Sequence, residues 1–117
     1  METISAVQAL SALAHEGRLA IFRLLVRAGP DGIAAGGIAR ETGVLPNTLS
    51  SNLNILAAAG LVTARREGRS IIYAAAYEHM RDLLAFLMED CCAGKPEICA
   101  PLIELASRCC AGESRVS

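Results

Sequence analysis

The stretch from residue 46 to residue 73, PNTLSSNLNILAAAGLVTARREGRSIIY, constrains the fold more than any other part of the chain. After its initial proline, apolar residues recur at helical spacing: Leu49, Leu53, Ile55 and Leu56. The residues between them are short and polar: Asn47, Thr48, Ser50, Ser51 and Asn54. This pattern predicts an amphipathic helix with an uncharged, hydrogen-bonding face. Gly60 ends the helix, and the two β-prone runs around residues 67–69 predict a β-hairpin.

The same periodicity predicts further helices on both sides of this stretch. We expect them over residues 3–13, 16–28 and 34–42 before it, and over 77–90 and 97–110 after it. A short helix joined to the next by a tight turn containing Gly43 is typical of a helix-turn-helix. Leu45 precedes Pro46 and has no capping group, so we expect Asn47 to be the N-cap of the following helix.

Positive charge is concentrated on the predicted hairpin, although the formal net charge of the chain is −1. Residues 61–77 hold Arg65, Arg66 and Arg69 against Glu67 alone, whereas residues 78–117 hold seven acids against four bases. Such a cluster is suited to a phosphate backbone. A solvated arginine-rich turn is the alternative interpretation. The position of the hairpin directly after a polar-faced helix favours DNA binding over a solvated turn.

Several classes of protein are disfavoured by the sequence. The longest weakly polar run, residues 55–64, is far shorter than the roughly 20 residues of a membrane span. The N-terminus shows no basic-then-apolar leader, so we expect a cytoplasmic protein without membrane contact. No cysteine lies in a phosphate-cradling loop and no acid/base pair is evident, so we do not expect an enzyme. The weak enzymatic alternative is a small arsenic-handling reductase or metal carrier.

Two of the predicted helices carry more apolar surface than a small monomer easily covers. The first helix has its apolar residues at a spacing of three: Ile4, Val7, Leu10 and Leu13. The helix over 77–90 has a longer stripe: Met80, Leu83, Leu84, Leu87 and Met88. We expect part of this surface to form a homodimer interface, with intramolecular packing as the alternative for any one residue.

Three motifs carry a resemblance to a known family. They are Leu13-Ala14-His15-Glu16-Gly17-Arg18-Leu19, Thr48-Leu49-Ser50 with Leu53 and residues 56–62, and Arg65-Arg66-Glu67-Gly68-Arg69 with Tyr73. Over residues 5 to about 90 the chain resembles the ArsR/SmtB family of metal-responsive repressors. The resemblance implies a mainly α fold with a β-hairpin wing, a winged helix-turn-helix of order α-α-α-α-β-β-α plus a C-terminal segment. It also implies a homodimer that binds palindromic operator DNA and leaves it when an inducer binds.

The resemblance assigns roles to particular residues and also shows departures. The residues expected to contact DNA are Asn47, Thr48, Ser50, Ser51, Asn54, Arg65, Arg66 and Arg69. Ser51 and Asn52 stand where many members have a histidine pair, so base preference is not carried over. The cysteines that founding arsenic repressors hold in the third helix are absent here. Of the zinc-sensing ligands along the fifth helix only His79 and the terminal Glu89 and Asp90 remain, and we expect His15 and His79 to be helix-end or surface residues.

All five cysteines lie after residue 90, which divides the chain into a DNA-binding and dimerisation domain (residues 1–90) and a cysteine-rich segment (residues 91–117). Three thiolates without a required histidine suit a soft ion. Together with a branch of arsenic repressors that the segment resembles, Cys91, Cys92 and Cys99 predict a site for As(III), with Sb(III) as an alternative ion. A thiol-redox or persulfide sensor is the rival hypothesis. Cys109 and Cys110 are either a second soft-ion site or thiols on a C-terminal tail.

Overall fold

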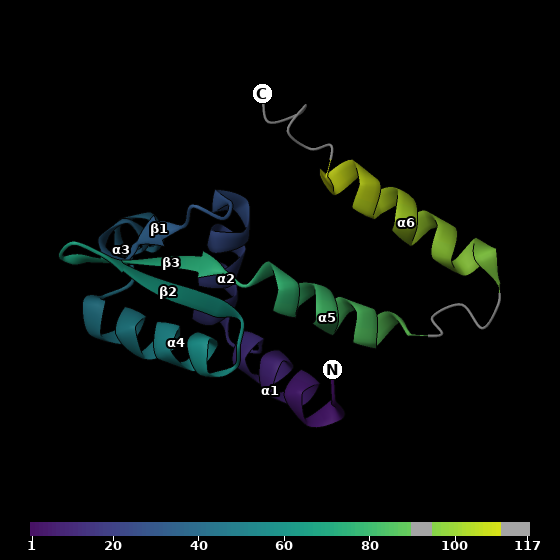
Figure 1. Cartoon of the computed structure of the whole chain (residues 1–117), viewed down its shortest axis with the longest axis horizontal. Helices are drawn as coiled ribbons and strands as arrows, with labels where there is room; N and C mark the ends of the chain where they lie inside the picture. Colours follow the sequence, from purple (N-terminus) through teal and green to yellow (C-terminus); the bar gives the residue numbers. More distant parts are fainter. Residues whose placement is uncertain (90–94, 111–117) are drawn as a thin grey trace. The chain divides into compact units, whose positions relative to one another are not determined.

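The computed structural model describes residues 1–89 and 95–110, with side chains up to residue 108 (Figure 1). The chain divides into two units, Met1–Phe86 and Leu87–Ser117. In chain order the elements are α1 (Thr3–Leu13), α2 (Glu16–Ala28), β1 (Ile33–Ala34), α3 (Ala35–Thr42), α4 (Pro46–Ala58), β2 (Val62–Glu67), β3 (Ser70–Ala75), α5 (Tyr77–Met88) and α6 (Pro96–Cys110). The predicted winged helix-turn-helix is confirmed, and its helices begin and end within one or two residues of the predicted bounds.

The three strands form one antiparallel sheet with the order β1-β3-β2. The hairpin β2–β3 keeps a continuous register from Val62 opposite Ala75 to Glu67 opposite Ser70. The sequence did not predict β1, because two residues are too few to show an alternating pattern. It pairs with β3 through Ile33 opposite Tyr73 and thereby ties the wing to the start of α3.

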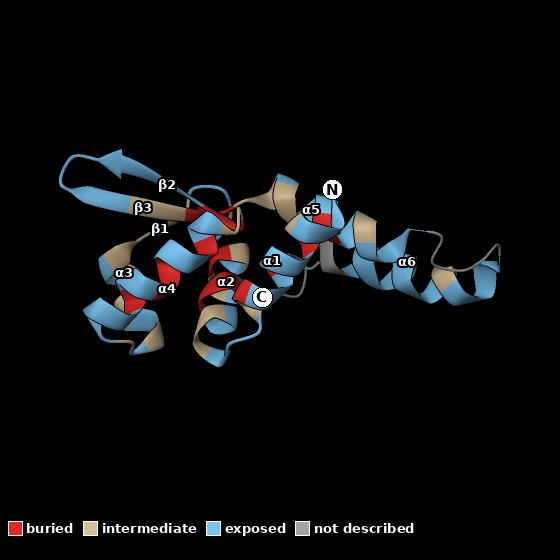
Figure 2. Cartoon of the chain, turned by 90° about the horizontal axis from the view of Figure 1, so that it is seen from below, coloured by how far each residue is buried: buried red, intermediate tan, exposed pale blue. Residues whose placement is uncertain are grey.

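The core lies where the helices of the first unit meet the base of the sheet, and the far part of the hairpin is exposed (Figure 2). Ala6, Ala9 and Ala12 are buried on α1, so this helix packs closely through methyl groups. The largest fully buried side chains come from α2, α3, α4 and the start of β2: Ile21, Leu25, Ile38, Leu53, Leu56 and Leu61. The start of α5 is held by the Tyr77 hydroxyl, which donates to the carbonyl of Val26 at 2.8 Å. The helix-turn-helix and α5 therefore share one core.

The expected N-cap at Asn47 is wrong. Leu45 occupies the N-cap position with extended backbone angles and no side-chain cap, and its carbonyl accepts a hydrogen bond from Leu49 N at 2.8 Å. The physical reason is Pro46, whose fixed φ suits the first helical position and whose missing N–H needs no acceptor. The helix therefore begins at the proline.

Candidate nucleic-acid interface

The polar face of α4 is fully presented to solvent. All five polar residues that the sequence assigned to DNA on this helix are exposed: Asn47, Thr48, Ser50, Ser51 and Asn54. The opposite face is fixed in the core through Leu49, Leu53 and Leu56. Ile55, which the sequence placed on the apolar face, is instead 40% exposed. Because the buried leucines fix the rotation of the helix about its axis, the polar face has one defined direction.

Asn52 is the exception among the polar residues of α4, since it is only 5% exposed. Its Oδ1 accepts a hydrogen bond from Nη1 of Arg18 on α2 at 3.4 Å. Nε of the same arginine donates to the carbonyl of Ala12 on α1 at 2.7 Å. Position 52, where the family pattern departs, therefore joins α4 to α1 and α2. A signal was present in the sequence, because the residue lies between Leu49 and Leu53 on the buried side.

His15 positions Arg18 by capping α2. Its Nδ1 accepts hydrogen bonds from the backbone N–H groups of Gly17 at 3.1 Å and Arg18 at 3.3 Å. Two of the N–H groups at the helix start that have no intrahelical partner are thereby satisfied. His15 therefore acts at a helix end.

His79 is the third residue of α5 and thus lies at a helix end, as expected, with its side chain partly buried. Its Nε2 is buried and has no hydrogen-bond partner among the described residues. The ring packs against Gly60, so closely that a Cβ at position 60 would lie 3.0 Å from Nε2. This contact joins α5 to the corner between α4 and β2.

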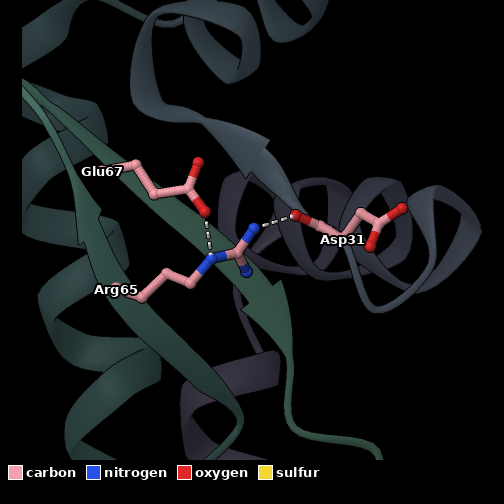
Figure 3. Close-up of polar contacts among 3 residues, drawn as sticks. All are labelled: Asp31, Arg65 and Glu67. Carbon is pink, nitrogen blue, oxygen red and sulfur yellow. Dashed lines mark hydrogen bonds and ion pairs between the residues drawn. The ribbon is translucent and has the colours of Figure 1, made fainter.

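The wing arginines differ in their surroundings. Nε of Arg65 pairs with Oε2 of Glu67 at 2.7 Å, and Nη2 donates to the carbonyl of Asp31 at 2.9 Å (Figure 3). Arg66 is the next residue along β2 and lies on the other face of the strand. Arg69 lies in the tight turn after Gly68, whose φ is +63°. The sequence did not show that the side chain of Arg65 is bound by Glu67 and by the carbonyl of Asp31.

Arg69 also borders a hollow of about 290 Å³ at the start of α3. Ala34, Ala35 and Gly36 form its other side, and no side chain caps the N-terminus of α3 there. A helix start with unsatisfied N–H groups favours a negatively charged oxygen. The arginine of the wing tip and the start of the helix-turn-helix therefore present positive potential to the same space.

The cysteine site lies largely outside the described residues. Cys91 and Cys92 follow the end of α5 there, while Cys99 is the fourth residue of α6 and Cys109 and Cys110 are its last two. In the part of the chain with described side chains, no group of three His, Cys, Asp or Glu residues could hold a metal ion. The predicted thiolate site therefore remains a prediction.

The first helix exposes most of its apolar stripe. Ile4 is 71% exposed, Val7 57% and Leu10 42%, while the alanines on the other side of α1 are buried.

Among the described residues, no helix is both long enough and apolar enough to cross a membrane.

A helix-turn-helix whose second helix exposes a polar face, followed by a basic hairpin, defines the winged helix-turn-helix class. A family described as "Helix-turn-helix domain" matches residues 13–65. An HTH-type transcriptional regulator of Mycobacterium tuberculosis is 37% identical over 73 residues, which are 62% of either chain. The chain thus spans under two thirds of the length of this relative.

Solved structures extend the comparison. The homodimeric winged helix-turn-helix DNA-binding domain of a possible ArsR-family regulator from Mycobacterium bovis is 37% identical, with a TM-score of 0.60 over 72% of this chain and 75% of that one. HlyU from Vibrio cholerae is 30% identical, with a TM-score of 0.59 over 74% of this chain and 97% of that one. The chain belongs to the ArsR family of winged helix-turn-helix transcriptional regulators. The relative from Mycobacterium tuberculosis is described as a transcriptional regulator, and the neighbour from Mycobacterium bovis as a DNA-binding domain.

Proposed function

We propose that this protein is a homodimeric repressor that binds double-stranded operator DNA and is released when trivalent arsenic binds Cys91, Cys92 and Cys99. The observation that carries the DNA-binding part is the exposed polar face of α4, which the buried leucines of the same helix hold in one direction. The inducer part rests on the thiol sequence and on the family resemblance.

The DNA-binding step follows from the shape of α4. A helix with short hydrogen-bonding side chains fits the major groove, where base edges present donors and acceptors. In a two-fold dimer the two copies of α4 would enter successive major grooves about 34 Å apart. Asn47, Thr48, Ser50, Ser51 and Asn54 would then face bases or phosphates.

The wing supplies contacts that do not depend on base sequence. Arg69, which borders the hollow beside the N-terminus of α3, would contact a phosphate oxygen. Arg66 extends from β2 without an ion-pair partner among the described residues. Arg65 must exchange Glu67 for phosphate before it contributes. We therefore expect Arg69 and Arg66 to contribute more than Arg65.

Dimerisation is supported by the exposed stripe of α1. Ile4, Val7 and Leu10 leave apolar area in contact with water that a second copy would cover. The structural neighbour from Mycobacterium bovis is itself homodimeric. A second copy is also what places two recognition helices on one operator.

Induction would couple the thiols to α4 through the fold. Cys91 follows the last residue of α5 by three positions, and Cys99 lies in the first turns of α6. Three soft thiolates would bind a soft trivalent ion, drawing the segment after α5 together. The other end of α5 is fixed on α2 by Tyr77, and His79 contacts the corner after α4. A coupling of about 1–3 kcal/mol would change operator affinity 5- to 150-fold.

The deciding experiment measures operator binding by gel shift with and without arsenite. Wild type should bind without arsenite and be released with it. Cys91→Ser, Cys92→Ser and Cys99→Ser should each bind the operator normally but stay bound in arsenite. Cys109→Ser and Cys110→Ser are the matched controls and should be released like wild type. A Cys92→Ser variant that is fully released by arsenite would contradict the site, and a wild type without operator affinity would contradict the repressor.

A thiol-redox or persulfide sensor of the same fold is the second candidate. It is favoured by the likeness to HlyU, which has also been solved in a form described as reduced, 30% identical with a TM-score of 0.58. Here peroxide or persulfide, and not arsenite, would release the operator. The loss of two mass units on disulfide formation, seen by mass spectrometry of the intact chain, would distinguish this candidate from the first.

A further inference from the structure

A hollow of about 350 Å³ opens between α1, the start of α2 and α4. Three alanines line it: Ala12 on α1, Ala58 at the end of α4 and Ala59, the C-cap of α4. Space remains between the helices here because each of these side chains is a single methyl group. The volume lies at the lower end of the roughly 300–1,000 Å³ that is usual for small-molecule sites.

Arg18 brings a positive charge to this hollow. Its two hydrogen bonds within the protein go to neutral oxygens, the carbonyl of Ala12 and Oδ1 of Asn52. Among the residues that the structure describes, no carboxylate lies within 4.0 Å of its guanidinium. A partly buried charge is stabilised by a counter-ion, and five N–H donors leave several for a ligand.

A second hollow shows that this arrangement is not general. The space between α2 and α3 is larger, about 440 Å³, but its charged residues are Glu16, Glu41 and Arg27. Its acids outnumber its base, so it offers no unmatched positive charge to an anion. The hollow beside Arg18 combines an apolar wall with such a charge.

We propose that the hollow between α1 and α4 binds a small organic carboxylate. The apolar body, one ring or a short chain, would lie against Ile55 and the alanines. The carboxylate would pair with the guanidinium of Arg18, and Gln8 and Ser11 supply further hydrogen-bonding groups. None of the residues that line this site is a cysteine, and the proposal does not depend on arsenic.

Occupancy of this site acts on the proposed recognition helix. Ile55 and Ala58 belong to α4 and Ala59 is its C-cap, and Arg18 also holds Asn52 of the same helix. A carboxylate on Arg18 would compete with Asn52 for the guanidinium. A ligand that takes the Nη1 donor from Asn52 would alter the packing of α4 on α2, and, given the proposed DNA-binding function, operator affinity would then depend on the ligand.

The test is an NMR titration of the full-length, ¹⁵N-labelled protein with benzoate, with benzamide as a neutral probe of the same shape. We expect benzoate to give saturable shifts at the amides of Ala12, Ala58 and Ala59, with a dissociation constant of about 1 mM or tighter. Benzamide should bind at least about tenfold more weakly, because it lacks the charge that Arg18 recognises.

A matched pair of variants on α4 completes the test. Ala58→Leu puts a larger side chain into the hollow and should abolish benzoate binding, whereas Ala57→Leu, at an exposed neighbour that does not line it, should leave binding unchanged. Both positions are exposed, so both variants should fold. Absence of saturable shifts, equal binding of benzamide, or unchanged binding to Ala58→Leu would overturn the proposal. If wild type does not bind benzoate and Ala58→Leu weakens dimerisation, the hollow belongs to the interface with a second copy. That outcome would also overturn the proposal.

Discussion

Nη1 of Arg18 donates to Oδ1 of Asn52 at 3.4 Å, so the helix that carries the polar face is tied to α2 by a buried carboxamide. Replacing Asn52 with Ala should remove this acceptor and leave a partly buried donor unsatisfied. We expect a loss of about 1–3 kcal/mol in the free energy of unfolding, measured by urea denaturation.

Asn54→Ala is the matched control, two residues further along α4 at an exposed position. It should leave the free energy of unfolding within about 0.5 kcal/mol of wild type. Its effect should instead be on operator affinity. Equal stability of the two variants would show that the Arg18 contact contributes nothing.

Arg69→Ala should weaken binding to every DNA sequence by a similar factor. Because each phosphate contact releases counterions, the slope of log affinity against log salt concentration should become shallower by about 0.9. The measurement is operator and non-specific DNA binding at several salt concentrations. An unchanged slope would remove Arg69 from the interface.

Glu67→Gln should strengthen DNA binding. It removes the carboxylate that holds Arg65 at 2.7 Å and also removes a negative charge from the wing. Since exposed ion pairs contribute about 0.2–1 kcal/mol, we expect operator affinity to rise by roughly 1.5- to 5-fold. In an Arg65→Ala background, Glu67→Gln should raise operator affinity by less than it does in wild type, because no arginine is freed there. An equal rise in both backgrounds would show that the freed Arg65 is not its source.

Gly60→Ala should destabilise the fold in two ways. The φ of +82° is strained for alanine by roughly 1 kcal/mol or more, and the new Cβ would press on the ring of His79. Gly43→Ala isolates the first effect, because its φ of +73° lies in the left-handed region but no atom lies within 4 Å of the added Cβ. The difference between the two losses, measured by urea denaturation, reports the His79 contact. Equal losses would mean that the ring moves aside freely.

Val7→Glu should dissociate the proposed homodimer. A charge at the centre of the exposed α1 stripe would be buried without a partner in a dimer formed there. Analytical ultracentrifugation should show a monomer at concentrations where wild type is dimeric. Ala20→Glu, at an exposed site on α2, should stay dimeric. A dimeric Val7→Glu variant would place the interface elsewhere.

The sequence predicted the helices well because most of them have a periodic apolar pattern, and a glycine closely follows α2, α3 and α4. It failed where a residue's role depends on a distant partner. The N-cap of α4 was misplaced by two positions, at Asn47 and not Leu45, because a proline at the first helical position outweighs a missing cap. The pairing of Arg65 with the carbonyl of Asp31 spans 34 residues and leaves no trace in a local pattern.

The candidate site was predictable only where it depends on a local pattern. The five polar residues of α4 could be assigned from helical spacing alone. Burial of Nε2 of His79 could not be predicted, because it depends on the contact with Gly60. The helical position of Asn52 indicated its burial but not its hydrogen bond from Arg18, which lies 34 residues away. The thiolate site remains a prediction, since Cys91 and Cys92 lie outside the described residues.

The strand order β1-β3-β2 leaves β2 at an edge of the sheet, with backbone groups able to pair with another molecule. This edge carries Arg65, Arg66 and Glu67 in succession. Charged side chains on an edge strand oppose such pairing, because a second strand would have to bring like charges together or bury them. The arginines that the wing would offer to DNA thus also protect the protein from aggregation through its sheet.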